Sequence, residues 1–203
     1  MSHSEINKNL PEGATPLDPD EAEDLRPGHI RTRGELNVWE QENILVSVSW
    51  IPRARSKALD EATIRELHRR MFSETWKWAG AFRLSDKTIG IHWPQIPEAV
   101  RNFVEDGRFW LREGTFSPDE SAIRLHHRLA QIHPFPNGNG RHARLWSDML
   151  LLQNGRPPIS WGGRNLETGS EARKKYIRAL QRADEGDYRP LLDLFLRDRP
   201  SDP

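Results

Sequence analysis

The sequence contains no cysteine, which excludes disulfide bonds, thiolate metal sites and a cysteine nucleophile. It has no run of 18 apolar residues that could cross a membrane, and residues 1–10 show no signal-peptide pattern, so we expect a cytoplasmic protein with no membrane partner. An excess of positive charge is also absent, because Lys+Arg and Asp+Glu number 30 each. Nucleic-acid-binding domains usually carry a basic excess, so no direct nucleic-acid partner is expected.

Hydrophobic residues make up only 35% of the chain, but eight tryptophans and seven phenylalanines can fill the core of one domain of 203 residues. Apolar residues recur at intervals of three and four, between capping residues and glycine or proline stops. The pattern predicts helices at about residues 33–50, 61–73, 97–113, 118–132, 140–153, 171–184 and from 190 onward. In the first helix the predicted inward stripe is Leu36, Trp39, Asn43, Val46 and Trp50. We therefore predict an all-α fold.

One segment departs from the helical pattern. Phe82-Arg83 and Thr88-Ile89-Gly90-Ile91 favour strands on either side of Ser85-Asp86. We expect one short β-hairpin there, and an ordinary surface hairpin is the simplest interpretation of this pattern alone.

A stretch rich in glycine and proline, His133-Pro134-Phe135-Pro136-Asn137-Gly138-Asn139-Gly140, separates two of the predicted helices. The next helix therefore begins near Gly140, with unpaired backbone N–H groups and the positive end of its dipole. Arg141 and Arg144 lie three residues apart on that helix and reach roughly the same face. This combination predicts an anion site, for which phosphate is the usual ligand. The alternative is a tight turn beside solvated arginines.

The same stretch resembles the signature of Fic (fido) domains, His-x-Phe-x-(Asp/Glu)-Gly-Asn-Gly-Arg-x-x-Arg. It departs from that signature at Asn137, where the family usually has an acid. The matching positions are His133, Phe135, Gly138, Asn139, Gly140, Arg141 and Arg144. From about Gly13 to Arg197 the chain also resembles the small stand-alone Fic proteins called mobile mystery protein B. We expect a partly disordered N-terminal extension at residues 1–30, a helix within 31–52 and a Fic domain at 58–197.

The resemblance implies a protein adenylyltransferase, which transfers AMP from ATP to a Ser, Thr or Tyr hydroxyl of a target protein. His133 would be the general base, and Phe135 would anchor the loop in the core. Position 137 would hold Mg²⁺, or Mn²⁺, between two phosphates of ATP, and because Asn137 carries no charge we expect weaker metal dependence. Phosphate oxygens would be bound by Gly138, Asn139 and Gly140, with Arg141 on the β-phosphate and Arg144 on the γ-phosphate.

Residues outside the signature receive roles from the same resemblance. The expected hairpin with Thr88-Ile89-Gly90-Ile91 corresponds to the family's flap, which covers the active site and docks the target as an added edge strand. Tyr176 corresponds to a tyrosine that lines the nucleotide pocket, although Asp184 stands where the family often has an asparagine. Core packing is the alternative for Tyr176.

Glu42-Asn43 is similar to the end of an inhibitory motif in many Fic proteins, Ser/Thr-x-x-x-Glu-(Gly/Asn). In the family this glutamate pairs with the second signature arginine. The resemblance therefore implies a Glu42–Arg144 pair that blocks productive nucleotide binding, although Val38 stands where the motif has Ser or Thr. The alternative is a solvated glutamate on a helix surface.

Other functions remain open on the sequence alone. The chain could be a weak or inactive nucleotide-binding or interaction module of a toxin–antitoxin-like system, which Asn137 favours and an intact His133 disfavours. It could also be a Fic enzyme with another phosphate-containing donor. A DNA-binding protein of a mobile element has only the cluster Arg173-Lys174-Lys175 in its favour. The sequence leaves a homodimer open and does not identify the target protein.

Overall fold

The computed structural model describes residues 16, 18–161, 170–197 and 199. The disorder expected in part of residues 1–30 therefore falls largely outside the described residues, since residues 1–15 and 17 are not among them. The described part of the chain is helical, which confirms the all-α prediction, and its only β contact is an isolated bridge between Leu25 and Trp76. No helix in the described ranges combines the length and the apolar character needed to span a bilayer. The α-helices are α1 (Pro19–Glu23), α2 (Arg33–Trp50), α3 (Glu61–Phe72), α4 (Ile96–Glu113), α5 (Pro118–Ile132), α6 (Asn139–Gln153), α7 (Glu171–Asp184) and α8 (Arg189–Leu196), with short 3-10 turns at Ile51–Arg53 and Trp93–Gln95.

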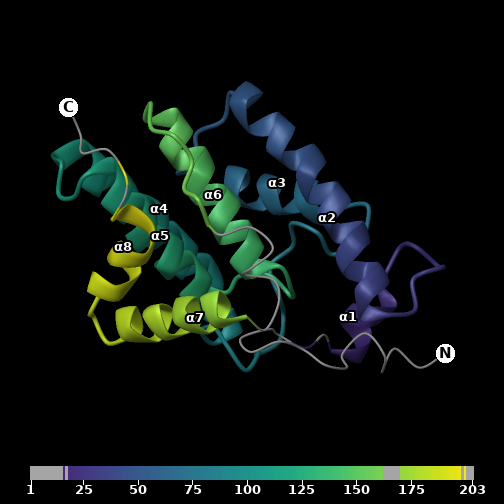
Figure 1. Ribbon diagram of the computed structural model, residues 1–203. Coiled ribbons are helices and arrows are strands. Elements are labelled where there is room, and N and C mark those ends of the chain that lie inside the picture. Colours follow the sequence, from purple (N-terminus) through teal and green to yellow (C-terminus); the bar gives the residue numbers. More distant parts are fainter. Residues whose placement is uncertain (1–15, 17, 162–169, 198, 200–203) are drawn as a thin grey trace.

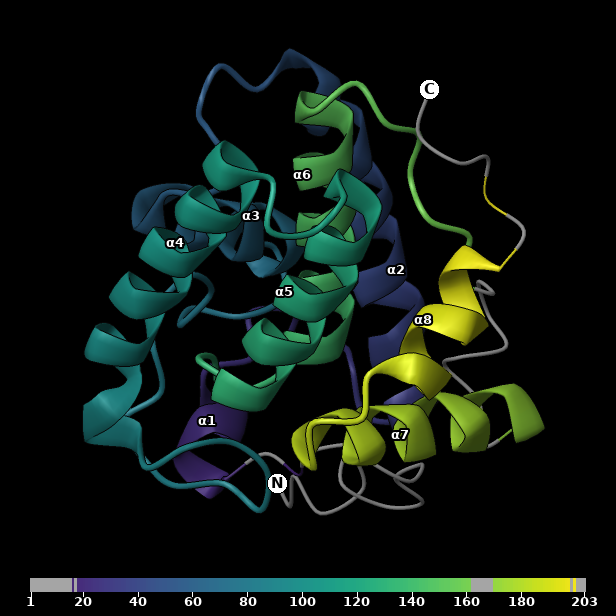
Figure 2. The same ribbon diagram turned by 90° about the vertical axis from the view of Figure 1, so that its left-hand side faces the viewer.

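Helices α5 and α6 form the centre of the structure, where they pack against each other (Figures 1 and 2). Helix α4 packs on α5, and α2 packs on α3, which in turn contacts α6. Helices α7 and α8 pack together and contact α5. The glycine- and proline-rich loop connects α5 to α6, so it lies at one end of the central helix pair (Figure 1).

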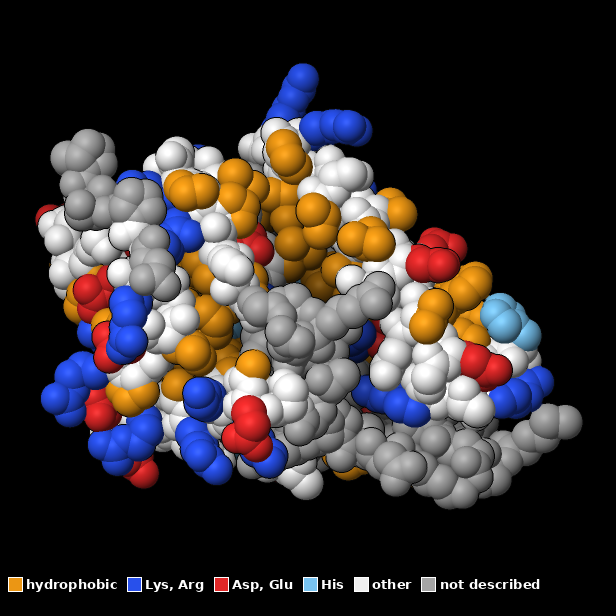
Figure 3. Space-filling view, viewed as in Figure 1, with side chains coloured by type: hydrophobic (Ala, Val, Ile, Leu, Met, Phe, Trp, Pro, Cys, Tyr) orange, Lys and Arg blue, Asp and Glu red, His pale blue; other side chains and the backbone are white. Residues whose placement is uncertain are grey.

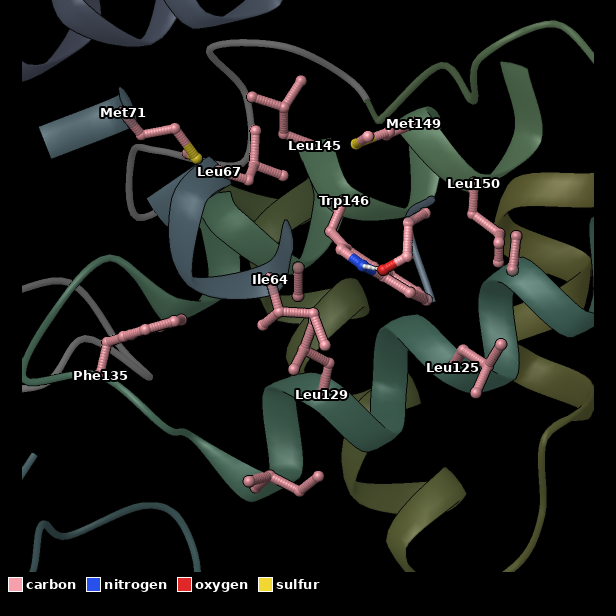
Figure 4. Packing of buried hydrophobic residues seen from close by; sticks show 14 of the residues in the cluster. Ile64, Leu67, Met71, Leu125, Leu129, Phe135, Leu145, Trp146, Met149 and Leu150 are labelled. Atoms are coloured by element: carbon pink, nitrogen blue, oxygen red, sulfur yellow. Dashed lines mark hydrogen bonds between the residues drawn. The ribbon is translucent and has the colours of Figure 1, made fainter. Parts of the chain in front are cut away.

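Large side chains from α3, α5 and α6 fill the core between these helices (Figure 4). Trp146 of α6 is fully buried, and its ring centroid lies 5.0 Å from that of Phe103 of α4. The indole N–H of Trp146 donates a 2.9 Å hydrogen bond to the Ala58 carbonyl, which satisfies its polar atom. Burying a large apolar side chain stabilises the fold by about 1.5–3 kcal/mol. These contacts fix α6, and with it the residues at its N-terminus.

The helices begin and end where capping residues satisfy their terminal backbone groups. Thr32 and Glu35 form a capping box at the start of α2, and the Ser117 hydroxyl accepts a hydrogen bond from the Glu120 N–H at the start of α5. Helix α4 ends at Gly114, which has a left-handed conformation with a φ of +62°. The predicted bounds of α2 and α5 are confirmed. They could be predicted because the capping signals are local in the sequence.

The β-hairpin predicted within residues 81–95 is not formed, since this stretch, all of it described, contains no strand. In a hairpin, backbone carbonyls would accept hydrogen bonds from N–H groups of the opposite strand. The carbonyls of Ser85, in the expected turn, and of Ile91, in the expected second strand, instead accept hydrogen bonds from the guanidinium of Arg83. A buried arginine therefore replaces the strand ladder, and residues 81–92 form an irregular loop that we call the flap segment.

Four buried histidines are held in the neutral state. Burial lowers the pKa of His126 to about 3 and the pKa of His142 to about 4. Burial also lowers the pKa of His133 to about 4 and the pKa of His68 well below its ordinary value of 6.5. Each of these side chains regains an ordinary pKa when the chain unfolds, so protonation favours the unfolded state below about pH 6.5.

We expect the free energy of unfolding to fall as the pH decreases from about 6.5 toward 4, because the unfolded chain binds protons at these histidines and the folded protein does not. Asp148 opposes this trend, since burial raises its pKa to about 6 and the folded state takes up its proton first. The single proton of Asp148 offsets only part of the proton uptake by the histidines. Denaturant titrations at about pH 7, 6 and 5 measure the effect. Equal free energies at all three values would contradict it.

Candidate active site

His133 directly follows α5 and has a left-handed backbone conformation, with a φ of +54° and a ψ of +57°. Among the described residues it is the only one other than glycine with a positive φ. This conformation costs roughly 1–2 kcal/mol for a residue with a Cβ atom. The His133 carbonyl accepts a 2.7 Å hydrogen bond from Nε of Arg83, which holds the strained residue in place.

The ring of His133 is buried, and its hydrogen bond selects one tautomer. Nδ1 lies 3.3 Å from the Ala130 carbonyl, and a carbonyl can only accept, so Nδ1 carries the proton. Nε2 is then the basic nitrogen. The pKa of His133 is lowered to about 4, mainly by burial and also by the cations Arg83 and Lys87, against the opposing effect of the bond to Ala130. The ring is therefore neutral at physiological pH, in the state that can accept a proton.

The loop before α6 is fixed by hydrogen bonds to its own buried backbone. The side-chain amide of Asn139 donates to the Phe135 carbonyl at 2.7 Å and accepts from the Phe135 N–H at 2.9 Å. The Phe135 ring is fully buried and stacks on His68, with ring centroids 3.7 Å apart. Nδ1 of His68 accepts from the Gly80 N–H, so Nε2 carries the proton and donates to the Asn137 carbonyl. Phe135 thus occupies the position expected of a loop anchor.

Gly138 makes the turn from this loop into α6. Its φ is +78°, and a Cβ atom there would lie 2.5 Å from Cζ of Phe72, so only glycine fits. The N–H groups of Asn139, Gly140 and Arg141 have no acceptor among the described residues. With the helix dipole they form a site suited to an anion. Only the backbone of Asn139 can take part, because its side chain is bonded within the loop.

Arg144 lies beside this helix terminus. Its Nη1 is 3.8 Å from the Cβ position of Gly140, and its guanidinium carbon lies 5.9 Å from the centre of the Tyr176 ring. Tyr176 is buried, and its hydroxyl is hydrogen-bonded to Nε2 of His126 at 2.9 Å. The structure therefore brings two of the predicted nucleotide-binding residues together, with Tyr176 packed against the guanidinium of Arg144.

Arg141 is paired with Glu40 of α2, a residue that sequence reasoning missed. One carboxylate oxygen of Glu40 lies 2.8 Å from Nη1 of Arg141, and the other accepts a 2.7 Å hydrogen bond from Nε1 of Trp76. The oxygen near Arg141 forms no directed hydrogen bond in the described residues, so the contact is a charge pair. A signal for Glu40 was present in the sequence, because it lies four residues from both Leu36 and Ile44, which are buried.

The expected Glu42–Arg144 pair is not formed, and Glu42 has no ion pair among the described residues. Glu42 lies two residues after Glu40, so its side chain points about 200° away around the helix. It lies on an exposed face of α2 with Val38 and Val46, which are 64% and 71% exposed, and Figure 3 shows apolar side chains along this helix. The buried residues of α2 are Leu36, Glu40, Ile44 and Ser47. Of the predicted stripe, Leu36 is buried and Trp39 and Trp50 are partly buried against the core, whereas Val46 is exposed.

The loop does not provide a metal site of its own. Asn137 offers a neutral amide oxygen, and this oxygen already accepts a 2.7 Å hydrogen bond from the Gly138 N–H. Throughout the described ranges no three acidic or histidine side chains are grouped so that they could hold a metal ion. Mg²⁺ prefers carboxylate oxygens, so Asn137 alone supplies no charge for the divalent ion expected at this position.

The flap segment lies directly against His133. Gly90 has a φ of +111°, and a Cβ atom there would lie 2.6 Å from the Cβ of His133. The other residues expected to dock a target, Thr88, Ile89 and Ile91, belong to the same segment, and the Ile89 side chain is partly exposed to solvent. The predicted base and the predicted docking segment are thus in contact, although no strand is formed there.

Residues 58–151 match the sequence model of the Fic/DOC family. The protein adenylyltransferase fic-1 of Caenorhabditis elegans is 33% identical over 144 residues, which cover 68% of this chain and 27% of that protein. The protein adenylyltransferase Fic of Drosophila melanogaster is 34% identical over 133 residues, which cover 64% of this chain and 26% of that protein.

Solved structures show the same fold. The structure of Fic-1 from Caenorhabditis elegans has a TM-score of 0.59 at 26% identity, over 86% of this chain and 51% of that chain. The BepC protein of Bartonella tribocorum, solved with bound AMPPNP, has a TM-score of 0.66 at 19% identity, over 87% of this chain and 96% of that chain.

The matched region contains α3, α4, α5, the whole signature loop and all but the last two residues of α6. This chain is therefore a Fic-domain protein of the Fic/DOC family. It spans about a quarter of the length of the curated relatives that it matches.

We expect Glu40→Gln to lower the free energy of unfolding by roughly 1–4 kcal/mol, because it leaves the charge of Arg141 without its buried partner. Glu42→Gln is the matched control on the same helix and should change it by less than about 0.5 kcal/mol, since Glu42 is exposed. Urea titrations of both variants measure the difference. Equal effects of the two substitutions would contradict the assignment of Glu40 as the buried partner.

Proposed function

We propose that this chain is a protein adenylyltransferase, which transfers AMP from ATP to a hydroxyl side chain of a target protein. The observation that carries the proposal is a neutral histidine base, His133, on a loop that ends in an anion-binding helix terminus with two arginines. Two relatives that are identical to this chain at about a third of the aligned residues are named protein adenylyltransferases. The structurally similar BepC was solved with a bound ATP analogue, AMPPNP.

In the proposed reaction, Nε2 of His133 takes the proton from a Ser, Thr or Tyr hydroxyl of the target. The hydroxyl oxygen forms a bond to the α-phosphorus of ATP. The bond from that phosphorus to the oxygen bridging to the β-phosphorus breaks, so pyrophosphate leaves and AMP stays on the target. His133 then releases its proton to solvent or to pyrophosphate. Catalysis of such a transfer is mostly positioning and charge stabilisation.

The start of α6 binds the phosphates in this proposal. The N–H groups of Asn139 and Gly140 contact phosphate oxygens, with Arg144 on the γ-phosphate and Arg141 on the β-phosphate. Arg144 already faces the helix terminus, whereas Arg141 must first be shared with or released by Glu40. In this chain Glu40 is therefore the carboxylate that competes with a phosphate. An inhibitory role of Glu42 stays a prediction of the resemblance.

In this proposal the flap segment docks the target, and residues 58–197 form the catalytic unit. Helix α2 packs on this unit as the N-terminal helix. A divalent ion, Mg²⁺ or Mn²⁺, would have to be held mainly by the phosphates of ATP, because Asn137 supplies no charge. The second candidate is a nucleotide-binding module without transfer. The neutral Asn137 and the occupied Arg141 favour it.

Incubation with α-³²P-ATP tests transfer onto cell-lysate proteins and onto the protein itself. We expect label with the wild type, and a loss of at least about 100-fold with His133→Ala, because general-base catalysis contributes on that scale. His29→Ala is the matched control, since His29 is an exposed histidine outside the site, and it should keep the wild-type rate. ATP binding with no label from any protein would instead support the binding module.

Asn137→Asp should raise turnover at limiting Mg²⁺, because a carboxylate adds a charged ligand next to the phosphates. The increase should shrink as Mg²⁺ approaches saturation. Initial rates measured against Mg²⁺ concentration for both proteins test this expectation. Turnover that is unchanged or lower at every concentration would count against a metal role for position 137.

A further inference from the structure

Arg83 has its guanidinium buried between the flap segment and the start of the signature loop. Its side chain has no exposed surface. Its three nitrogens donate to the backbone carbonyls of Ser85, Ile91 and His133. The backbone N–H of Arg83 donates a 2.9 Å hydrogen bond to the Pro134 carbonyl. One residue therefore connects two separated positions of the flap segment to the loop that carries the base.

A buried guanidinium is unfavourable unless its charge is compensated. Within the described ranges, the one ion pair of Arg83 is with Asp86, at 3.7 Å, and that carboxylate is 56% exposed. Burial accordingly lowers the pKa of Arg83. The side chain is held by three carbonyl oxygens in three directions, which the planar fork of arginine can reach together and the single ammonium of lysine cannot.

The flap segment and the base interlock through Gly90. A Cβ atom on Gly90 would lie 2.6 Å from the Cβ of His133 and 2.8 Å from Nη2 of Arg83. The backbone of the flap segment can therefore approach the base only where a residue has no side chain. Any shift of Arg83 moves both surfaces of this contact.

A second tie holds the flap segment to α1. The Lys87 side chain is almost fully buried, and its Nζ lies 2.7 Å from a carboxylate oxygen of Asp18 and 2.5 Å from one of Glu21. The Ser85 hydroxyl also donates to Asp18 at 2.9 Å. The flap segment is thus anchored on one side to α1 and on the other, through Arg83, to the signature loop.

We propose that Arg83 is a positioning residue for the transfer reaction, which locks the backbone of His133 in its left-handed conformation and holds the flap segment against the base. One side chain thereby determines both the orientation of the base and the position of the surface on which a target docks. This inference rests on the proposed adenylyl transfer, but the state of the His133 ring is measurable whether or not transfer occurs.

Arg83→Lys is the direct test, because it keeps the positive charge near His133 and removes the three-way fork. We expect kcat to fall about 10- to 100-fold, since a displacement of the base by about 1 Å has an effect of this size. The KM for ATP should stay within about twofold, because Arg83 makes no contact with the start of α6. This split separates positioning from a general loss of structure.

The ¹⁵N signals of the His133 ring give a readout that does not depend on activity. We expect the Nδ1–H tautomer in the wild type and a mixture of tautomers in Arg83→Lys. Nearby charges also affect the pKa of the His133 ring. They are Arg83, Lys87 and Asp86 on the flap segment, Asp18 at the N-cap of α1 and Glu21 within α1. Because Arg83→Lys keeps the charge, a changed tautomer reports geometry.

Gly90→Ala is an independent variant in case Arg83→Lys does not fold. Its methyl group would collide with His133, so it should lower kcat in the same way. Gly186→Ala is the matched control: Gly186 also has a positive φ, of +89°, but no atom lies within 4 Å of a Cβ placed there. It should keep the wild-type kcat.

The outcomes separate the inference from the proposed function. A folded Arg83→Lys with wild-type kcat and an unchanged His133 tautomer would overturn the inference, as would an equal loss of kcat and of ATP binding. If Arg83→Lys does not fold, a wild-type kcat for Gly90→Ala would overturn it. If the wild type transfers no AMP, the proposed function fails, and the His133 spectra of the wild type and the two variants decide the role of Arg83 alone.

Discussion

Two hydrogen bonds between the side chain of Asn139 and the peptide group of Phe135 hold the loop on which the rest of the site depends. They satisfy a peptide N–H and a carbonyl that are buried with the Phe135 ring, and each would cost about 1–3 kcal/mol if left unpaired. With them in place, Gly138 can turn against Phe72, and α6 begins with its first N–H groups unpaired in the described structure. A buried polar contact inside the loop thus creates an anion site at its surface.

Electrostatics around the loop favour an anionic ligand. The histidines nearby are neutral because they are buried, so the positive potential comes from the helix terminus, Arg141 and Arg144. The carboxylate that reaches this group is Glu40, which pairs with Arg141 from the neighbouring helix α2. A bound phosphate would therefore find Arg144 already beside the loop and Arg141 paired with Glu40. Under the proposed function, nucleotide affinity depends on how readily α2 releases or shares Arg141.

Local signals made much of the fold predictable. Ser117 and Ser170 cap their helices through contacts three residues away, so the bounds of α5 and α7 could be predicted from short stretches. The hairpin prediction was wrong because its carbonyls bond to a guanidinium, and no local alternation of residues reveals that. The assignment of Glu42 followed a motif, whereas counting in steps of four from Leu36 leads to Glu40.

Tertiary contacts determine what the sequence could not reveal in the site. Arg83 and His68 are single polar residues in segments whose patterns predict secondary structure only, and their importance comes from carbonyl groups that lie far away in the chain. The role expected for Asn139 was a contact with phosphate. That contact stays a prediction for its backbone N–H, and its side chain stabilises the loop, which becomes visible only when the irregular backbone of the loop is known.

The central claim is that the loop and the start of α6 form a phosphate-binding site that exists before the nucleotide arrives. Titration of ¹⁵N-labelled protein with AMPPNP, followed by amide NMR, tests this claim most directly. The account predicts saturable shifts of the Gly140 and Arg141 amides and of the Arg144 guanidinium, while the Asn139 side-chain amide and the Phe135 amide keep the signals of intact hydrogen bonds. No saturable binding, or shifts that leave the start of α6 unchanged, would contradict it.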